Sequence, residues 1–444
     1  MLKKIKLEKL LMALFAGILI SASAIAQQKE ITLDEGIQIG LQNSKTLHSS
    51  KMKVVSAEAN LSEMNAARLP SLSLSASYTH LSPVNPFSVA TPFGIFTLSP
   101  SILDNYNLKL SLQQPLFTGF KLSSGSDVAK YNSLAAKQQY TQDEQDLILN
   151  IKNAYWGLFN AEKVKEAIDD NYQQVKAHLT DVQNFFKQGL STKNDMLKVE
   201  VQLSEIQLQQ IDAKNSVRIA VVNLDNVIGL SLSTELQIPQ KVNVSENNEY
   251  DLDGLIDQAL QNRPDLKALQ YQVEASKSGI KLAESNWYPQ IYLTGNYYYA
   301  KPNQRILPSE NKFDATWDVG VGISFNLWNW GATKDQTTQA EAQYEQSNDG
   351  LKTMKDAITL EVTQDFYNMV KAKEKILVAE QTVTQAEENY RVTDDKFKQG
   401  LTLNSELLDA ETALLQAKTN QIQSLVDYEL AVARIERSTG TGIK

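Results

Sequence analysis

The sequence predicts a mixed fold, in which a long α-helical coiled-coil barrel is combined with four transmembrane β-strands per chain. Three observations predict it. Two stretches of the chain correspond to each other, long proline-free segments carry apolar residues at helical spacing, and shorter segments alternate between apolar and small polar residues. The first observation indicates an internal two-fold repeat, the second is typical of coiled-coil helices, and the third is typical of strands in a membrane barrel.

The repeat is clearest in the pentapeptide Phe-Lys-Gln-Gly-Leu, which occurs at 186–190 and again at 397–401. Gly229 likewise corresponds to Gly440. A duplication this regular argues for one pseudo-symmetric body rather than two independent domains. The predicted divisions are a first repeat at 27–230, a polar connector at 231–251 with a short strand at 241–244, a second repeat at 252–440, and a tail at 441–444.

The N-terminus has the three parts of a secretory signal peptide. Four lysines within the first nine residues precede an apolar run from Leu10 to Ile20 and the small-residue cleavage site Ala24-Ile25-Ala26. We therefore expect residues 1–26 to be removed, which leaves Gln27 as the first mature residue. The alternative is a membrane anchor, for which the run is short. The chain has no cysteine, which excludes disulfides, thiolate metal sites and a lipid-modified N-terminal cysteine.

Composition argues against nucleic-acid binding and catalysis. The net charge is −9, whereas a nucleic-acid-binding protein needs a basic surface. The three histidines, His48, His80 and His178, are far apart in the sequence, so we expect them at the surface rather than on a metal. No phosphate-binding glycine loop, nucleophile elbow or zinc-protease motif is present. We expect no enzyme activity and no cofactor.

Each repeat begins with a helical segment, at 33–69 and at 252–288, that is followed by two strands. The strands are predicted at about 71–82, 105–117, 290–300 and 315–328. Small polar side chains alternate there with apolar ones and are expected to face a water-filled lumen: Ser71, Ser73, Ser75, Asn107, Ser111, Thr294 and Asn296. A soluble half-buried sheet would show the same alternation. The segments 83–104 and 301–312 would be the distal loops of the two hairpins.

Aromatic residues favour the membrane interpretation, because they gather at both ends of the predicted strands. The helix-side group is Phe117, Trp287, Tyr288, Trp328 and Trp330, and the distal group includes Tyr297 and Tyr299. Two aromatic belts one strand length apart are typical of a barrel that crosses a bilayer.

Very long helices follow the strands. Residues 120–188 and 332–399 contain no proline, and apolar residues recur every three or four positions from Leu147 to Phe186. A helix of ~70 residues would be roughly 100 Å long. Shorter return helices are predicted at 193–228 and 404–437.

Four strands cannot close into a barrel, and an open sheet edge in lipid leaves backbone groups unpaired. The chain must therefore oligomerise. Two chains would give an eight-stranded barrel filled by its own side chains, while three would give a twelve-stranded barrel with room for water. The small polar lumen residues favour the trimer.

With its signal peptide, duplicated helix–hairpin–helix unit and paired Gly-Leu turns, the sequence resembles the TolC-like outer membrane efflux proteins over essentially all of 30–440. The resemblance implies a trimer in the outer membrane with a helical tunnel through the periplasm. It also implies a periplasmic adaptor protein and an inner-membrane transporter as partners, for which the chain is the passive exit duct. The alternative is a pore-less periplasmic scaffold or adaptor.

The resemblance also implies roles for residues at the helical tip. The turns that the adaptor contacts correspond to Gly189, Leu190, Ser191, Gly400, Leu401 and Thr402, with glutamine in place of the relatives' preceding valine. The acidic residues of the constricted tunnel end correspond to Asp195, Glu406 and Asp409, and the aromatic latch corresponds to Phe397. Helix reversal alone would also explain the glycines, and helix capping would also explain the acids in the first turn.

Overall fold

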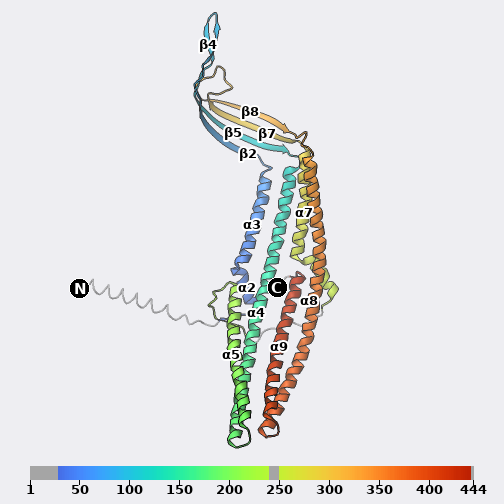
Figure 1. Cartoon of the computed structure of the whole chain (residues 1–444). Helices are drawn as coiled ribbons and strands as arrows, with labels where there is room; N and C mark the ends of the chain where they lie inside the picture. The colour runs from blue at the N-terminus through green and yellow to red at the C-terminus, as the bar shows by residue number, and fades with distance from the viewer. Residues whose placement is uncertain (1–28, 240–249, 442–444) are drawn as a thin grey trace, which may run out of the picture. The chain divides into compact units, whose positions relative to one another are not determined.

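The computed structural model describes residues 29–239 and 250–441 (Figure 1). Contacts divide the chain into two compact units. Of the described residues, one unit contains those up to Ser49, those between Thr141 and Arg263 and those from Ala357 onward, and the other contains Ser50–Tyr140 and Pro264–Asp356. The predicted signal peptide and the predicted strand at 241–244 lie outside the described residues.

The shorter helices come in pairs where the sequence predicted single helices. These are α2 (Leu33–Asn43) with α3 (Lys45–Ala66), and α6 (Leu252–Asn262) with α7 (Pro264–Glu284), which a 3₁₀ turn (Ser285–Trp287) extends. The prediction of unbroken helices was wrong for two local reasons. The Ser44 hydroxyl accepts a hydrogen bond from the Leu47 amide at 3.1 Å and so caps α3. Pro264 opens α7, because it lacks an amide hydrogen and disfavours helical backbone in the residue before it.

The long helices agree with the sequence prediction to within a residue. They are α4 (Lys121–Lys187) and α8 (Ala332–Lys398), with 67 residues each, and their return helices are α5 (Lys193–Ile228) and α9 (Asn404–Ser438). Among the described residues, no helix combines the length and apolarity needed to cross a membrane.

Each return helix ends at the break of a shorter pair. A Cβ atom at Gly229 would lie 2.8 Å from Cβ of Asn43, and one at Gly440 would lie 2.8 Å from the Cα atom of Arg263. Both glycines have left-handed backbone, with φ of 74° and 64°. The close approach and the dihedral each require glycine there.

The core of the first unit includes an apolar cluster that joins α4, α5, α8 and α9. Its members are Ile168, Val175, Val182, Val199, Ile206, Ala213, Phe397 and Leu407. The predicted stripe of α4 supplies much of it, but the last aromatic contact comes from Phe185, which packs on Phe397 at 5.6 Å between ring centroids. Phe186, which the sequence analysis assigned to the stripe, is exposed.

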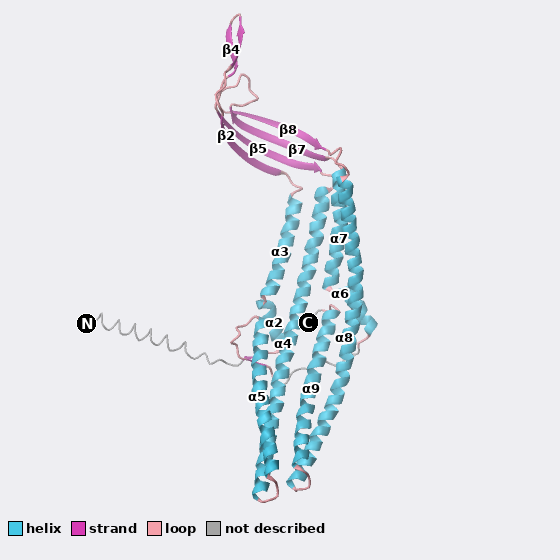
Figure 2. Cartoon of the chain, viewed as in Figure 1, coloured by secondary structure: helices cyan, strands magenta, loops and turns pink. Residues whose placement is uncertain are grey.

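In the second unit, four antiparallel strands form one sheet in the order β2-β5-β7-β8 (Figure 2). They are β2 (Ser71–His80), β5 (Asp104–Phe117), β7 (Gln290–Lys301) and β8 (Asp314–Ser324). Two strands end earlier than predicted. The end of β8 is Ser324 because its partner Gln290 is the first residue of β7. The end of β2 is His80, which pairs with the first residue of β5.

The described residues contain two further, smaller strand pairs. The segment 83–104, predicted as a loop, contains a hairpin of β3 (Phe87–Thr91) and β4 (Gly94–Ser99). In the first unit, β1 (Lys29–Glu30) pairs in parallel with β6 (Leu236–Gln237), which belongs to the predicted connector.

Candidate functional site

The sheet has one apolar face and one polar face, and the strand register determines which residues share each of them. Leu110, Tyr297 and Trp317 lie opposite one another on the apolar face. That face is solvent-exposed in the single chain, and Trp317 is 71% exposed. A continuous exposed apolar surface of this kind indicates contact with lipid or with another protein.

The polar face carries a row of side-chain hydrogen bonds across three strands. The Ser111 hydroxyl donates to Oδ1 of Asn296 at 2.8 Å, and Nδ2 of Asn296 donates to Oδ1 of Asp318 at 2.7 Å. The register places on this face all the residues that were predicted to line a lumen, namely Ser71, Ser73, Ser75, Asn107, Ser111, Thr294 and Asn296. The hydroxyls of Ser71 and Ser75 donate to backbone carbonyls of β5, each at 3.4 Å.

The helix-side aromatic residues gather where strands meet helices. Phe117 packs edge-on against Tyr288, with ring centroids 6.4 Å apart, and Trp328 packs edge-on against Trp330 at 5.8 Å. Trp287, Trp328 and Trp330 are exposed, Trp330 by 88%. Trp330 also has left-handed backbone, with φ of 57°, which is rare for a bulky residue.

The distal aromatic group contains Phe313 in addition to the residues that the sequence predicted. Tyr297 and Tyr299 lie on the apolar face, and Phe313 stacks on Tyr299 at 5.1 Å. Tyr106 lies 5.7 Å from Phe313 and 5.0 Å from Tyr78. Phe313 lies between the predicted loop 301–312 and the predicted strand 315–328, although its spacing of two and four residues from Ala315 and Trp317 was a usable signal.

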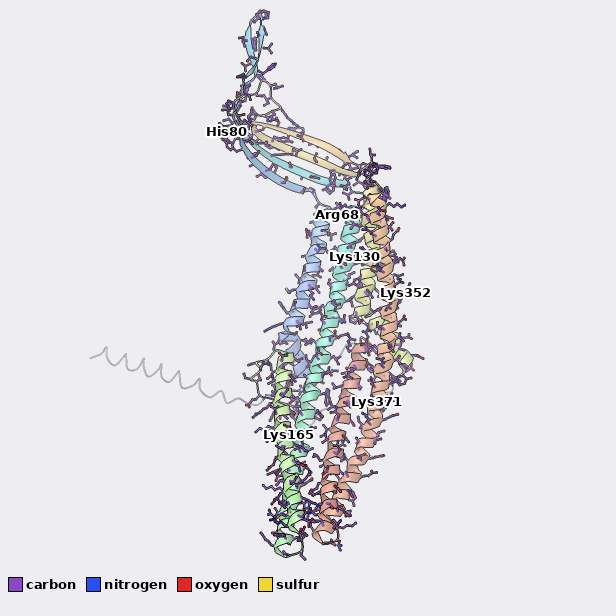
Figure 3. All side chains as sticks on the ribbon, in the orientation of Figure 1. Arg68, His80, Lys130, Lys165, Lys352 and Lys371 are labelled. Atoms are coloured by element: carbon purple, nitrogen blue, oxygen red, sulfur yellow. The ribbon has the colours of Figure 1, made fainter. Side chains whose placement is uncertain are left out.

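Figure 3 labels residues near the two ends of β2. Arg68 lies just before the strand on the helix side, and His80 is its last residue at the distal end. His80 places Nδ1 at 2.8 Å from Oδ1 of Asp104, the first residue of β5. Tyr78 donates to the same carboxylate oxygen at 3.0 Å. The distal end of the apolar face is therefore bordered by polar groups.

The two tip turns have the same hydrogen-bonded structure. The amide of Leu190 donates to the carbonyl of Phe185 at 2.8 Å, and the amide of Leu401 donates to that of Lys396 at the same distance. Gly189 and Gly400 hold φ of 75° and 71°. This is the Schellman ending of a helix. It leaves the two leucine side chains exposed, by 73% and 70%. Ser191 and Thr402 are partly exposed.

Asp195 is engaged as a helix cap. Its carboxylate accepts hydrogen bonds from the amide and the hydroxyl of Thr192, at 3.1 and 2.6 Å, and its own amide donates to that hydroxyl. The hydrogen bond from the Thr192 side chain is the main cause that lowers the pKa of Asp195, against an opposing effect of burial. The contacts of Asp195 are therefore those of a helix-capping residue.

The three predicted acids come from two neighbouring helix starts. Nδ2 of Asn404, the first residue of α9, donates to the Asp195 carbonyl at 3.3 Å. Glu406 lies in the first turn of α9, where the Thr402 hydroxyl donates to its carboxylate, and Asp409 lies one turn further on. Both Glu406 and Asp409 are exposed. Their spacing places them on one face of the helix.

His178 was expected at the surface, and that expectation was wrong. It is 3% exposed, and its Nδ1 lies 3.3 Å from Oε2 of Glu411, which is also buried. The ring of Phe397 packs edge-on against the imidazole at 4.9 Å. Among the described residues, Nε2 of His178 and Oε1 of Glu411 find no hydrogen-bond partner. The expected latch position, Phe397, is thus a buried core residue beside the contact between His178 and Glu411.

The chain is similar in sequence and in fold to known outer membrane and secretion proteins. Alkaline protease secretion protein AprF of Pseudomonas aeruginosa is 26% identical over 343 residues, which cover 76% of this chain and 70% of that protein. Outer membrane protein TolC of Vibrio cholerae is 25% identical over 319 residues, which cover 71% of this chain and 72% of that protein. The solved structure of the outer membrane protein VceC from Vibrio cholerae superposes with a TM-score of 0.78 at 20% identity, covering 92% of this chain and 96% of that one.

The model of the outer membrane efflux protein family matches two stretches of the chain, residues 36–230 and 255–441. Between them these stretches include both strand pairs of the sheet, both long helices and both return helices. The chain belongs to the outer membrane efflux protein family.

Proposed function

We propose that the chain is the outer-membrane exit duct of a tripartite efflux or secretion system, a passive trimeric channel whose helical body extends through the periplasm. The observation that carries the proposal is the four-stranded sheet, which has an exposed apolar face and a polar face linked by side-chain hydrogen bonds. Family membership supports a channel rather than an enzyme.

Three chains would contribute four strands each to a twelve-stranded barrel, since among the described residues of one chain β2 and β8 each have a single partner strand. The polar face would line an aqueous bore. The aromatic residues at the two ends of the strands would lie at the two membrane interfaces. The same order of helix pair, strands and long helices in residues 27–230 and 252–440 supports an internal duplication.

At the other end of the duct, the turns at 189–191 and 400–402 would contact a periplasmic adaptor that connects the duct to an inner-membrane transporter. Their exposed leucines offer apolar contacts to such a partner. Glu406 and Asp409, repeated by threefold symmetry, would form acidic rings that gate the tunnel and favour cations. The neighbouring start of α5 would bring Asp195 to the same level, although this carboxylate also caps its helix.

The test is conductance of the purified chain in planar bilayers. The proposal expects trimeric, cation-selective channels, and a soluble monomer without conductance would contradict it and favour a pore-less scaffold. The double variant Glu406→Gln with Asp409→Asn should weaken the cation preference. Glu58→Gln, whose carboxylate pairs with Lys137 at 2.7 Å in the other unit, is the control. Unchanged selectivity in the double variant would remove these acids from the gate.

A further inference from the structure

The segment between β7 and β8 is folded back onto the sheet. Asn303 is only 4% exposed, and its side-chain amide donates to the carbonyl of Asp314 at 3.0 Å and to the hydroxyl of Thr316 at 3.1 Å. Its side-chain oxygen accepts a hydrogen bond from the amide of Arg305 at 3.0 Å. These contacts fix the first residues of the connection against β8.

The side chain of Arg305 lies on the polar face of the sheet. Its guanidinium donates to Oδ2 of Asp318 at 2.7 Å and to the carbonyl of Trp317 at 2.8 Å. The guanidinium carbon also lies 5.5 Å from the ring centroid of Tyr298. Because Asp318 ends the hydrogen-bonded row that begins at Ser111, Arg305 extends that row beyond the last strand.

A second cation shares the same aromatic ring. The ammonium of Lys109 lies 5.4 Å from the Tyr298 centroid, and the register pairs Lys109 with Tyr298 on the polar face. Beside them is an open cavity of about 260 Å³, lined in part by Asn107, Tyr298 and Arg305. The two cations that lie over this ring outnumber the one carboxylate beside it, Asp318. Asp314 lies on the same face of β8 and has the Lys312 ammonium 3.9 Å away.

We propose that Arg305 and Lys109 form a cationic constriction at the outer mouth of the duct, held in place by the folded-back segment 302–305. The inference rests on the proposed function, since it needs the polar face to line the bore. Threefold symmetry would place three copies of each cation around the mouth. Fixed charges at a narrow point of a bore set the ion preference there. This site is opposite in sign to the acids at the helical tip, and it determines how anions leave the duct.

The test uses variants that change the same site in opposite directions. Arg305→Gln and Lys109→Gln each remove a positive charge, so reversal potentials in a salt gradient should shift toward cations, by roughly threefold in the permeability ratio. Asp318→Asn removes the negative charge and should shift the ratio toward anions. Arg305→Lys keeps the charge and should keep the wild-type ion preference.

Matched controls come from the apolar face of the same strands. The ammonium of Lys301 lies over the rings of Tyr106 and Phe313, at 5.7 and 6.0 Å, and Asp104 pairs with His80. Lys301→Gln and Asp104→Asn make the same charge changes away from the bore and should leave selectivity unchanged.

Two outcomes would overturn the inference. If Arg305→Gln and Asp318→Asn shift selectivity in the same direction, or raise conductance without changing selectivity, Arg305 and Asp318 only hold the segment against the sheet. If conducting channels form and none of the polar-face variants changes their ion preference, the mouth carries no selective charge while the proposed function stands. Complete absence of channels from the wild-type chain would instead overturn the proposed function, and this constriction with it.

Discussion

Asp225 illustrates how burial alone changes the chemistry of a residue. It lies near the end of α5 and is fully buried. Burial raises the pKa of its carboxyl to about 6, partly opposed by the backbone amide of Thr234. An ordinary aspartate has a pKa of about 3.9. The folded chain therefore binds this proton more tightly than the unfolded chain, and stability decreases as pH rises between these two values.

Replacement of Asp225 by asparagine should remove this penalty. Near pH 7.5 the free energy of unfolding should rise by up to about 3 kcal/mol, since each unit of pKa shift corresponds to about 1.4 kcal/mol. Below about pH 3 the variant and the wild type should be equally stable, because the aspartate is then largely protonated in both states. Thermal unfolding from pH 3 to 8 measures the difference.

Asp212→Asn is the control for this prediction, because Asp212 is an exposed carboxylate on the same helix. Its pH dependence should follow that of the wild type. An Asp225→Asn variant with the same dependence of stability on pH as the wild type would contradict the raised pKa of Asp225.

The pair of His178 and Glu411 shows what residue-level prediction can and cannot do. His178 is spaced three residues after Val175 and four before Val182, so its place in the apolar stripe of α4 could be deduced from the helical period. Burial of Glu411 could not be deduced in this way, because it depends on which helix packs against α9. Removal of one partner from a buried pair leaves the other uncompensated, which makes such pairs sensitive to substitution.

At the scale of elements, the tip turns depend on backbone conformation rather than on space. Nothing lies within 4 Å of where a Cβ atom would be at Gly189 or Gly400, yet both residues are left-handed. For other L-residues this conformation costs about 1–2 kcal/mol. The turns therefore tolerate added volume but resist side chains that disfavour positive φ.

Substitution of either tip glycine by alanine should destabilise the last helical turn by about 1 kcal/mol, because alanine disfavours the left-handed backbone. Hydrogen exchange of the amides next to each turn should become faster by the factor that corresponds to this free energy. The matched control is Gly350→Ala, within α8 and with open space around it, which should be neutral or stabilising by up to about 1 kcal/mol. If alanine at Gly350 and alanine at Gly189 changed stability equally, the left-handed conformation of the turn would not be the cause of the destabilisation.

The long helices could be predicted from the sequence almost to the residue because their period and lack of proline are local properties. The break at Arg263 also had a local signal in Pro264, but the break at Ser44 had only a serine that also suits a helix surface. Strand ends depend on partners. Ser324 ends β8 because β7 begins at Gln290, and no pattern within 315–328 contains that information.

At the scale of the whole molecule, the repeat and the order of elements were sufficient to identify the family from the sequence. The chemistry at the distal end of the sheet was not predictable. Arg305 and Asp318 are thirteen residues apart, and only the folded-back segment brings them together on the polar face. Phe313 similarly joins the distal aromatic group through a contact with Tyr299.

The proposed orientation can be tested on intact cells, because the chain has no cysteine that would react. Phe93→Cys places a thiol in the turn of the β3–β4 hairpin, where the side chain is 92% exposed. A maleimide carried on a polyethylene glycol too large for porins should label it from outside. Ser405→Cys, exposed at the start of α9, should react only after the outer membrane is opened. The reverse pattern would contradict the orientation.

The outer edges of β2 and β8 have a consequence for how the duct is made. In the described part of one chain, the sheet order leaves each of these strands with one bonded neighbour. A single chain would therefore expose rows of unpaired backbone groups if it entered lipid alone. In the proposed trimer, insertion and assembly of the three copies would then be one concerted event. Its rate would rise steeply with the number of chains awaiting assembly, and slow synthesis would prolong the time that each copy spends at risk of aggregation.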